Sequence, residues 1–251
     1  MCGIYKNRKK IFLICLGLCF VFVLSSCTPP LPSITVITSM PPKDFDVVLI
    51  VNGETEFKVS ESRVAWEVQF CFEYYGWKME DYAKNGIEYA VLRITAHNET
   101  FEVDIDAACF DDYHSVVTLN VKNKNITYGK PLGRSIFLVS LRSVLGLAAM
   151  GSLFYLFGYR KKRSWVSFAI INLPGEVFIN ILIDGTSIYR EAQLWILGCA
   201  LFYGIFVFAI KSIAMCIAVN EHKKLKTFLY VYIASNAGFW TLLVSTMFLP
   251  F

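Results

Sequence analysis

Four long apolar segments fill the second half of the chain and constrain its fold more than any other feature. They run over residues 135–159, 165–183, 194–219 and 227–249. A helix needs about 20 apolar residues to cross a hydrocarbon core of about 30 Å, and each segment approaches or exceeds that length. Because a backbone in lipid must satisfy its own hydrogen bonds, segments of this length span a membrane as helices. The sequence therefore predicts a four-helix transmembrane domain over residues 135–251.

The composition agrees with a membrane protein. Of the 251 residues, 55% are hydrophobic and 16% are aromatic. Only 18% are charged, whereas soluble domains carry roughly 25% charged residues. The net charge of +4 is too small to indicate a partner such as nucleic acid. The excess Lys and Arg lies beside the apolar segments, which indicates membrane topology rather than ligand binding.

The loops between the apolar segments differ in charge. The first loop, at 160–163, consists of Arg and Lys only, and the third, at 220–226, carries three lysines. The middle loop, at 184–193, has mixed charge. Loops rich in Lys and Arg stay on the cytoplasmic side of a membrane. We therefore expect a multi-pass protein of the cell membrane, with both basic loops inside and with residues 28–134 and the C-terminus extracytoplasmic.

The N-terminus has the three parts of a secretory leader. Basic residues within 6–10 precede an apolar stretch of about 14 residues at 11–24, which is short for a span and typical of a signal peptide. Leu24-Ser25-Ser26-Cys27 resembles the lipobox of bacterial lipoproteins. Residues 1–27 are therefore predicted to be a lipoprotein-like leader with Cys27 lipidated. The alternative is a short signal anchor that remains as a fifth span, and in either case the next residues begin outside the cytoplasm.

Residues 28–134 form the predicted exterior domain, in which apolar and polar side chains alternate with the period of two that is typical of half-buried β-strands. The clearest strands are 101–106 and 117–121; further candidates are 34–38, 45–51, 65–74 and 88–95, separated by turn signals such as Asn52-Gly53. About six short strands in about 100 residues predict a small antiparallel β-sandwich. The expected fold class is a membrane α+β protein, with this sandwich followed by a four-helix bundle.

Two of the eight cysteines, Cys71 and Cys109, lie in the predicted exterior domain. In an oxidising compartment an isolated pair predicts a disulfide, which would close a loop of about 39 residues and stabilise the fold by about 3 to 4 kcal/mol. Two buried thiols are the alternative.

The sequence carries no catalytic motif. HExxH, GxSxG, CxxC and a phosphate-binding glycine loop are all missing. Asp111, Asp112 and His114 could offer oxygen and nitrogen ligands to a metal ion, but adjacent polar residues in a loop are more often only solvated. We therefore expect neither an enzyme nor a bound metal or cofactor.

Polar residues inside the apolar segments are the most informative exceptions to the pattern. The predicted intramembrane polar cluster consists of Arg142, Asn172, Glu176, Asn180, Lys211 and Asn236. Asn172, Glu176 and Asn180 recur every fourth residue and so share one helical face, which cannot face lipid cheaply. Counting residues from the segment ends places Arg142 at the depth of Glu176 and Lys211 about 6 to 9 Å deeper. The sequence therefore predicts a Glu176–Arg142 contact with Lys211 nearby.

Two interpretations of this cluster follow. Arg142, Glu176 and Lys211 either form a site for an ion, a proton or a lipid headgroup, or they fix the register of the helices while the long basic side chains extend toward water. Small residues at helical spacing, among them Gly204 and Gly238, favour close helix packing and agree with the second interpretation.

The chain resembles a group of uncharacterised bacterial integral membrane proteins, mostly Gram-positive. The resemblance is carried by the lipobox-like leader, the β-rich exterior portion, Phe157-Gly158-Tyr159-Arg160 after the first apolar segment, and the polar Asn172/Glu176/Asn180 face. It implies acidic residues inside the first and third spans, where this chain instead has Met150 and Lys211. The resemblance implies a location in the bacterial cell envelope and no particular activity.

Three classes of function remain open on the sequence. The expected one is a membrane-anchored extracytoplasmic binding, sensory or accessory-subunit protein that works with the lipid bilayer and with a membrane or envelope protein partner. The alternative is a small transporter or channel component that uses Arg142, Glu176 and Lys211. A membrane-embedded enzyme is the third, although no nucleophile and base pair is visible.

Overall fold

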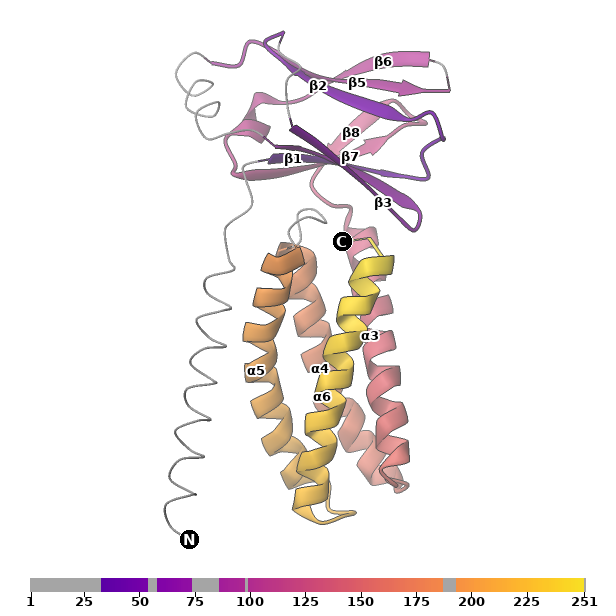
Figure 1. Cartoon of the computed structure of the whole chain (residues 1–251), viewed down its shortest axis with the longest axis vertical. Coiled ribbons are helices and arrows are strands. Elements are labelled where there is room, and N and C mark those ends of the chain that lie inside the picture. The colour runs from indigo at the N-terminus through magenta and orange to yellow at the C-terminus, as the bar shows by residue number, and fades with distance from the viewer. Residues whose placement is uncertain (1–32, 54–57, 74–85, 98, 187–192, 251) are drawn as a thin grey trace.

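The computed structural model describes residues 33–53, 58–73, 86–97, 99–186 and 193–250. The predicted leader and the lipidation site at Cys27 lie outside these residues. Within them, a β-rich region precedes four long helices and lies against one end of the helical bundle (Figure 1).

Eight strands and one short 3-10 helix make up the described part of the β-rich region. They are β1 (Ser33–Ser39), β2 (Asp46–Val51), β3 (Lys58–Val64), β4 (Glu67–Glu73), β5 (Ala90–Ala96), β6 (Glu99–Asp104), η1 (Ala107–Phe110), β7 (His114–Asn120) and β8 (Asn125–Tyr128). One sheet has the strand order β3-β4-β1-β7-β8 and the other the order β2-β5-β6. The six predicted strands are present with shifted ends.

The sequence patterns missed β3 and β8. β3 is an edge strand of the larger sheet and reads Lys-Val-Ser-Glu-Ser-Arg-Val, so its apolar residues are too few to show a period of two. β8 is the other edge strand and is only four residues long. Edge strands commonly carry charges or stay short, because both features prevent pairing with other chains.

One strand pair contradicts the predicted antiparallel arrangement. β1 pairs with β4 in antiparallel orientation on one side but with β7 in parallel orientation on the other, with Val36 opposite Val117. Parallel strands need a long crossover connection, which a pattern of local hairpin signals cannot reveal. The chain between β1 and β7 supplies that crossover and forms all three strands of the second sheet as well as β3 and β4.

A single hydrophobic core receives side chains from both sheets. Val36 and Phe70 contribute from the larger sheet, and Leu49 and Leu92 contribute from the smaller one. All four side chains are almost completely buried. Because residues on one face of a strand repeat every second position, β1, β2, β4, β5 and β7 contribute alternate residues to this core.

The predicted Cys71–Cys109 disulfide is not formed. Cys109 lies in η1 as a free thiol that packs into the hydrophobic core. Cys71 lies on β4 between Phe70 and Phe72, whose side chains both belong to that core. Successive side chains of a strand point to opposite faces, so Cys71 points away from the core and away from Cys109. Burial of Cys109, with the nearby charges of Asp106 and Asp112, raises the pKa of its thiol.

The four helices are α3 (Leu132–Leu156), α4 (Lys162–Thr186), α5 (Gln193–Ala218) and α6 (Lys224–Phe248). They alternate in direction, and α3 contacts α4, α4 contacts α5, α5 contacts α6 and α6 contacts α3, which closes the bundle (Figure 1). By length and composition α3, α4 and α6 can each cross a membrane. In α5 the described apolar stretch covers Tyr203–Ala218.

The end of the bundle opposite the β-rich region, called the basic end below, carries the two basic loops. α3 ends there at Leu156, and Gly158 follows with φ +87°. Tyr159 N–H donates to the Phe154 carbonyl at 3.3 Å, and Gly158 N–H donates to the Tyr155 carbonyl at 3.0 Å. These two bonds form a Schellman motif, and the Tyr159 ring stacks on Phe154 as that motif favours. This geometry explains the order Phe157-Gly158-Tyr159.

Glu221 connects the two loops at the basic end. Its carboxylate accepts hydrogen bonds from the backbone N–H groups of Arg160, at 2.8 Å, and Lys161, at 3.2 Å. Burial alone would raise the pKa of Glu221, but these bonds and one from the Ser164 side chain outweigh burial and lower the pKa. The carboxylate therefore stays ionised among the surrounding lysines and arginines.

Candidate functional site: an ion pair inside the helical bundle

α4 presents a polar face to the interior of the bundle. Asn172, Glu176 and Asn180 are all buried there. The Asn172 side-chain amide donates to the Phe168 carbonyl at 2.9 Å, and that of Asn180 donates to the Glu176 carbonyl at 2.9 Å. Both asparagines thus satisfy an amide N–H within their own helix, which leaves Glu176 as the residue that needs a partner from another helix.

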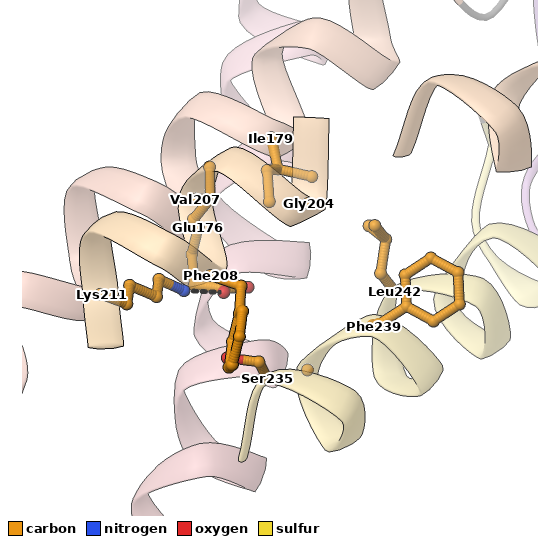
Figure 2. Close-up of a pocket in the computed structure, with 10 residues that line it drawn as sticks. Glu176, Ile179, Gly204, Val207, Phe208, Lys211, Ser235, Phe239 and Leu242 are labelled. Atoms are coloured by element: carbon orange, nitrogen blue, oxygen red, sulfur yellow. Dashed lines mark hydrogen bonds and ion pairs between the residues drawn. The ribbon is translucent and has the colours of Figure 1, made fainter. Parts of the chain in front are cut away.

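Lys211 of α5 supplies that partner. Its Nζ donates to Glu176 Oε1 at 2.8 Å, and Figure 2 shows the lysine side chain extended along α5 toward the carboxylate. The two side chains are 5% and 11% exposed. Because the charges cancel at contact distance, the interior of the bundle gains no net charge from them.

Glycines make the room that this ion pair occupies. A Cβ atom at Gly146 of α3 would lie 2.6 Å from Glu176 Oε2, and one at Gly175 of α4 would lie 2.7 Å from Lys211 Cε. A Cβ at Gly238 of α6 would lie 3.7 Å from Glu176 Oε1 and 3.4 Å from the sulfur of Met150. Residues from all four helices therefore surround the pair, and a larger side chain at Gly146 or Gly175 would force Glu176 or Lys211 to shift.

The predicted contact between Glu176 and Arg142 does not occur. Arg142 donates instead to the backbone carbonyl of Pro250, at the C-terminal end of α6. Ser143, next to Arg142, lies 3.4 Å from the amide nitrogen of Asn180, so Arg142 is level with Asn180 rather than with Glu176. Glu176 is level with Gly146, one turn further along α3. Counting residues from segment ends missed this offset, because it depends on how far each helix extends beyond its apolar segment.

Asn236 does not belong to the interior cluster. Its side chain is exposed on the outer surface of α6, where its amide donates to the Tyr232 carbonyl at 2.8 Å. Donation to the carbonyl four residues earlier satisfies an amide N–H without help from another helix. The exposed position corrects the prediction that Asn236 belongs to the intramembrane polar cluster.

A small cavity of about 50 Å³ adjoins the ion pair between α4, α5 and α6. Its lining includes Glu176, Lys211, Ser235, Phe208 and Phe239 (Figure 2). A cavity of this volume holds one or a few water molecules.

A second cluster of buried charges joins the β-rich region to the bundle, and sequence analysis missed it. Arg134, in the first turn of α3, donates from Nε and Nη2 to the two carboxylate oxygens of Glu67 on β4, each at 2.8 Å. Arg134 Nη1 lies 4.0 Å from Asp184 of α4. Lys130 donates to the Asp184 backbone carbonyl at 2.6 Å. We call Glu67, Lys130, Arg134 and Asp184 the interface latch.

The interface latch brings two cations, Lys130 and Arg134, close enough to repel each other. The pKa of Lys130 falls to about 8, chiefly because its ammonium group is buried and despite the attraction of Asp184. Arg134 contributes repulsion to the same shift. The Trp66 ring, beside Glu67 on the chain, also contacts Phe137 of α3 with ring centroids 5.9 Å apart. Polar and aromatic contacts therefore both hold the β-rich region on α3.

Two open grooves lie on the β-rich region. One, of about 360 Å³, has a polar lining that includes Asp106, Asp112, His114 and Tyr128; we call it the η1 groove. Burial lowers the pKa of His114, whose Nδ1 lies 3.0 Å from the Ser33 hydroxyl. The other groove, of about 590 Å³, lies where the turns after β1, β5 and β7 meet.

The metal alternative for Asp111, Asp112 and His114 gains no support. Within the described ranges, no group of three or more His, Cys, Asp or Glu side chains is arranged to hold a metal ion. The side chain of His114 instead meets Ser33 and the ring of Tyr113, 4.6 Å away between ring centroids.

Comparisons with protein-family models, with curated proteins and with solved structures find no match to this chain. The resemblance to uncharacterised bacterial membrane proteins therefore stays a prediction. Function has to be argued from the geometry of the chain itself.

Proposed function

We propose that the protein is a membrane-anchored binding or accessory subunit, in which the β-rich region binds a partner and the helical bundle anchors and orients it. In this proposal the two sheets and their shared core constitute a small β-sandwich. The basic loops lie in the cytoplasm, and the β-rich region lies outside, as the charge distribution favours. The basic end and the β-rich region occupy opposite ends of the bundle, which supports this orientation.

The observation that carries the proposal is that one short chain segment both lines the η1 groove and begins α3 of the bundle. Tyr128 and Gly129 line this groove, and α3 begins at Leu132. Lys130 and Arg134, on the same short segment, belong to the interface latch. A partner that occupies the η1 groove would therefore contact the chain segment that ties the β-rich region to α3 and α4.

Site-specific photo-crosslinking in native membranes tests the proposal. Benzoylphenylalanine at Tyr128, which is 55% exposed beside the η1 groove, is compared with the same probe at Tyr232, which is 54% exposed on α6. We expect one discrete protein adduct from position 128, lost when Asp112→Asn alters the groove, and only lipid adducts from position 232. Equal adduct patterns from both positions would contradict a binding role for the β-rich region.

The alternative, a transporter or channel component, has one observation in its favour, the cavity beside Glu176 and Lys211. We expect purified protein in vesicles to show no ion flux above that of a Glu176→Gln/Lys211→Met variant. If the protein shows an ion flux and the double substitution abolishes it, the protein is a transporter or channel component and the binding proposal is wrong. The crosslinking experiment probes the β-rich region and the flux experiment probes the helical bundle. The result of each therefore bears on one of the two proposed functions.

A further inference from the structure

The Glu176–Lys211 ion pair has hydrogen-bonding capacity left over. An ammonium group has three donors and a carboxylate about four acceptor positions, and the contact between these two side chains uses one of each. Buried ion pairs become favourable only when further hydrogen bonds satisfy what remains. A polar group in the adjoining cavity could bond to both side chains.

The cavity adjoins an apolar groove on the outer surface of the bundle. It shares Gly204, Phe208, Ser235 and Phe239 with an apolar groove of about 280 Å³ between α5 and α6. Trp240 lines this α5–α6 groove and is largely exposed on the outer surface of α6. Figure 2 shows Phe208 beside the ion pair, with Phe239 on the α6 side of the same opening. The ion pair therefore lies directly behind residues that line this groove.

The chemistry of this arrangement defines the ligand. The groove lining is mostly apolar, with Ile205, Phe208, Tyr232, Phe239 and Trp240 among its residues, which suits a hydrocarbon chain. The pair itself is neutral as a unit, so a carboxylate or ammonium headgroup would bury an uncompensated charge. A hydroxyl group both donates and accepts, so it can bond to the Glu176 carboxylate and to the Lys211 ammonium together.

We propose that the α5–α6 groove binds a neutral, single-chain membrane amphiphile whose hydroxyl headgroup occupies the cavity and bonds to Glu176 and Lys211. The glycine at 204 leaves the groove open, since nothing lies within 4 Å of the Cβ atom that another residue would carry there. The site is separate from the β-rich region, so it neither requires nor excludes a protein partner there.

Photolabelling of the full-length protein in lipid vesicles tests the inference. The probes are hexadecanol, palmitic acid and hexadecane, each carrying a diazirine on the chain, and labelled residues are mapped by mass spectrometry. We expect saturable labelling of groove residues by the alcohol, competed by unlabelled hexadecanol. Palmitic acid and hexadecane should label the groove at least about tenfold less, since each lacks one or both of the hydrogen bonds that the headgroup makes to charged partners.

Two variants separate a built site from ordinary lipid contact. Gly204→Leu fills the groove and should abolish saturable labelling, whereas Gly133→Leu, another helical glycine with open space around its Cβ, should not. Glu176→Gln/Lys211→Met keeps the groove but removes the charges, and should reduce labelling by the alcohol to the level of hexadecane. Labelling that does not saturate, or that survives either Gly204→Leu or the double substitution, would overturn the proposal and leave only water in the cavity.

Discussion

The bundle interior and the interface with the β-rich region each contain a buried ion pair, but the two pairs are built differently. Lys211 meets Glu176 through one hydrogen bond in a space that glycines of the neighbouring helices leave open. Arg134 meets Glu67 through two parallel hydrogen bonds, with Asp184 nearby. The planar guanidinium matches a carboxylate in a fixed orientation, whereas the ammonium acts as a point charge. The interior pair therefore fixes helix contact, and the interface pair also fixes orientation.

The largest expected effect comes from breaking the interior pair on one side only. Lys211→Met leaves a buried carboxylate without its counter-charge and should lower the free energy of unfolding by about 3 to 5 kcal/mol. Glu176→Gln/Lys211→Met buries no charge and should recover most of that loss. Thermal unfolding in detergent measures both, with Lys162→Met at the exposed basic end as a control near zero. If the double variant is as unstable as Lys211→Met, the loss of stability does not come from the unpaired charge of Glu176.

Breaking the interface pair should destabilise the protein less, because this pair lies at the end of the bundle rather than inside its apolar interior. Arg134→Gln leaves Glu67 unpaired and should destabilise the interface by about 2 to 4 kcal/mol, measured as faster proteolysis between the β-rich region and α3. Arg93→Gln is the matched control, since Arg93 and Glu102 also meet at 2.8 Å but are 49% and 48% exposed, against 10% and 1% for Arg134 and Glu67. Exposed pairs contribute about 0 to 1 kcal/mol. Equal effects of Arg134→Gln and Arg93→Gln would show that burial does not make the interface pair more stabilising than an exposed pair.

The stability that the interface latch contributes should rise with pH in the alkaline range. Lys130 has a pKa of about 8 in the folded protein, below the ordinary value of 10.5. Between these values the unfolded chain binds more protons than the folded one, so stability rises with pH from about 8 to 10.5. The gain is at most about 3 kcal/mol. Lys130→Met should flatten this part of the melting temperature profile, and a profile that Lys130→Met leaves unchanged would assign the dependence to another group.

The smallest effect is expected at the basic end, where a backbone motif closes α3. Gly158→Ala places a side chain on a residue with φ +87° and should destabilise the protein by about 1 kcal/mol. Gly133→Ala, in the first turn of α3 and with open space at its Cβ, should be neutral or slightly stabilising. Thermal unfolding of both variants measures the difference. No difference between them would mean that the Schellman motif contributes little.

Local patterns in the sequence predicted much of this architecture. Apolar length located the four helices, although α3 begins at Leu132 rather than near residue 135. Alternation located six strands but missed β3 and β8, the edge strands with weak or short patterns. The spacing of Asn172, Glu176 and Asn180 identified a polar face, because residues four apart on a helix always lie on the same side.

The contacts of the candidate site could not be predicted in the same way. Whether Glu176 meets Arg142 or Lys211 depends on the axial offset of three helices and on the space at Gly146 and Gly175. The interface latch joins residues 67 positions apart, Glu67 and Arg134, through side chains that look like ordinary surface charges in the sequence. Cys109 packs into the hydrophobic core whereas Cys71 lies on the other face of β4, and which face of β4 meets the second sheet is decided only by the tertiary structure.

The sequence by itself determined the four helices, six of the eight described strands and which loops are basic, because these properties follow from the length and period of local runs of residues. Only the tertiary structure decided which charged side chains meet, since that choice depends on how elements distant in the chain are aligned and on where glycines leave room. The Glu176–Lys211 and Glu67–Arg134 pairs are both of the second kind.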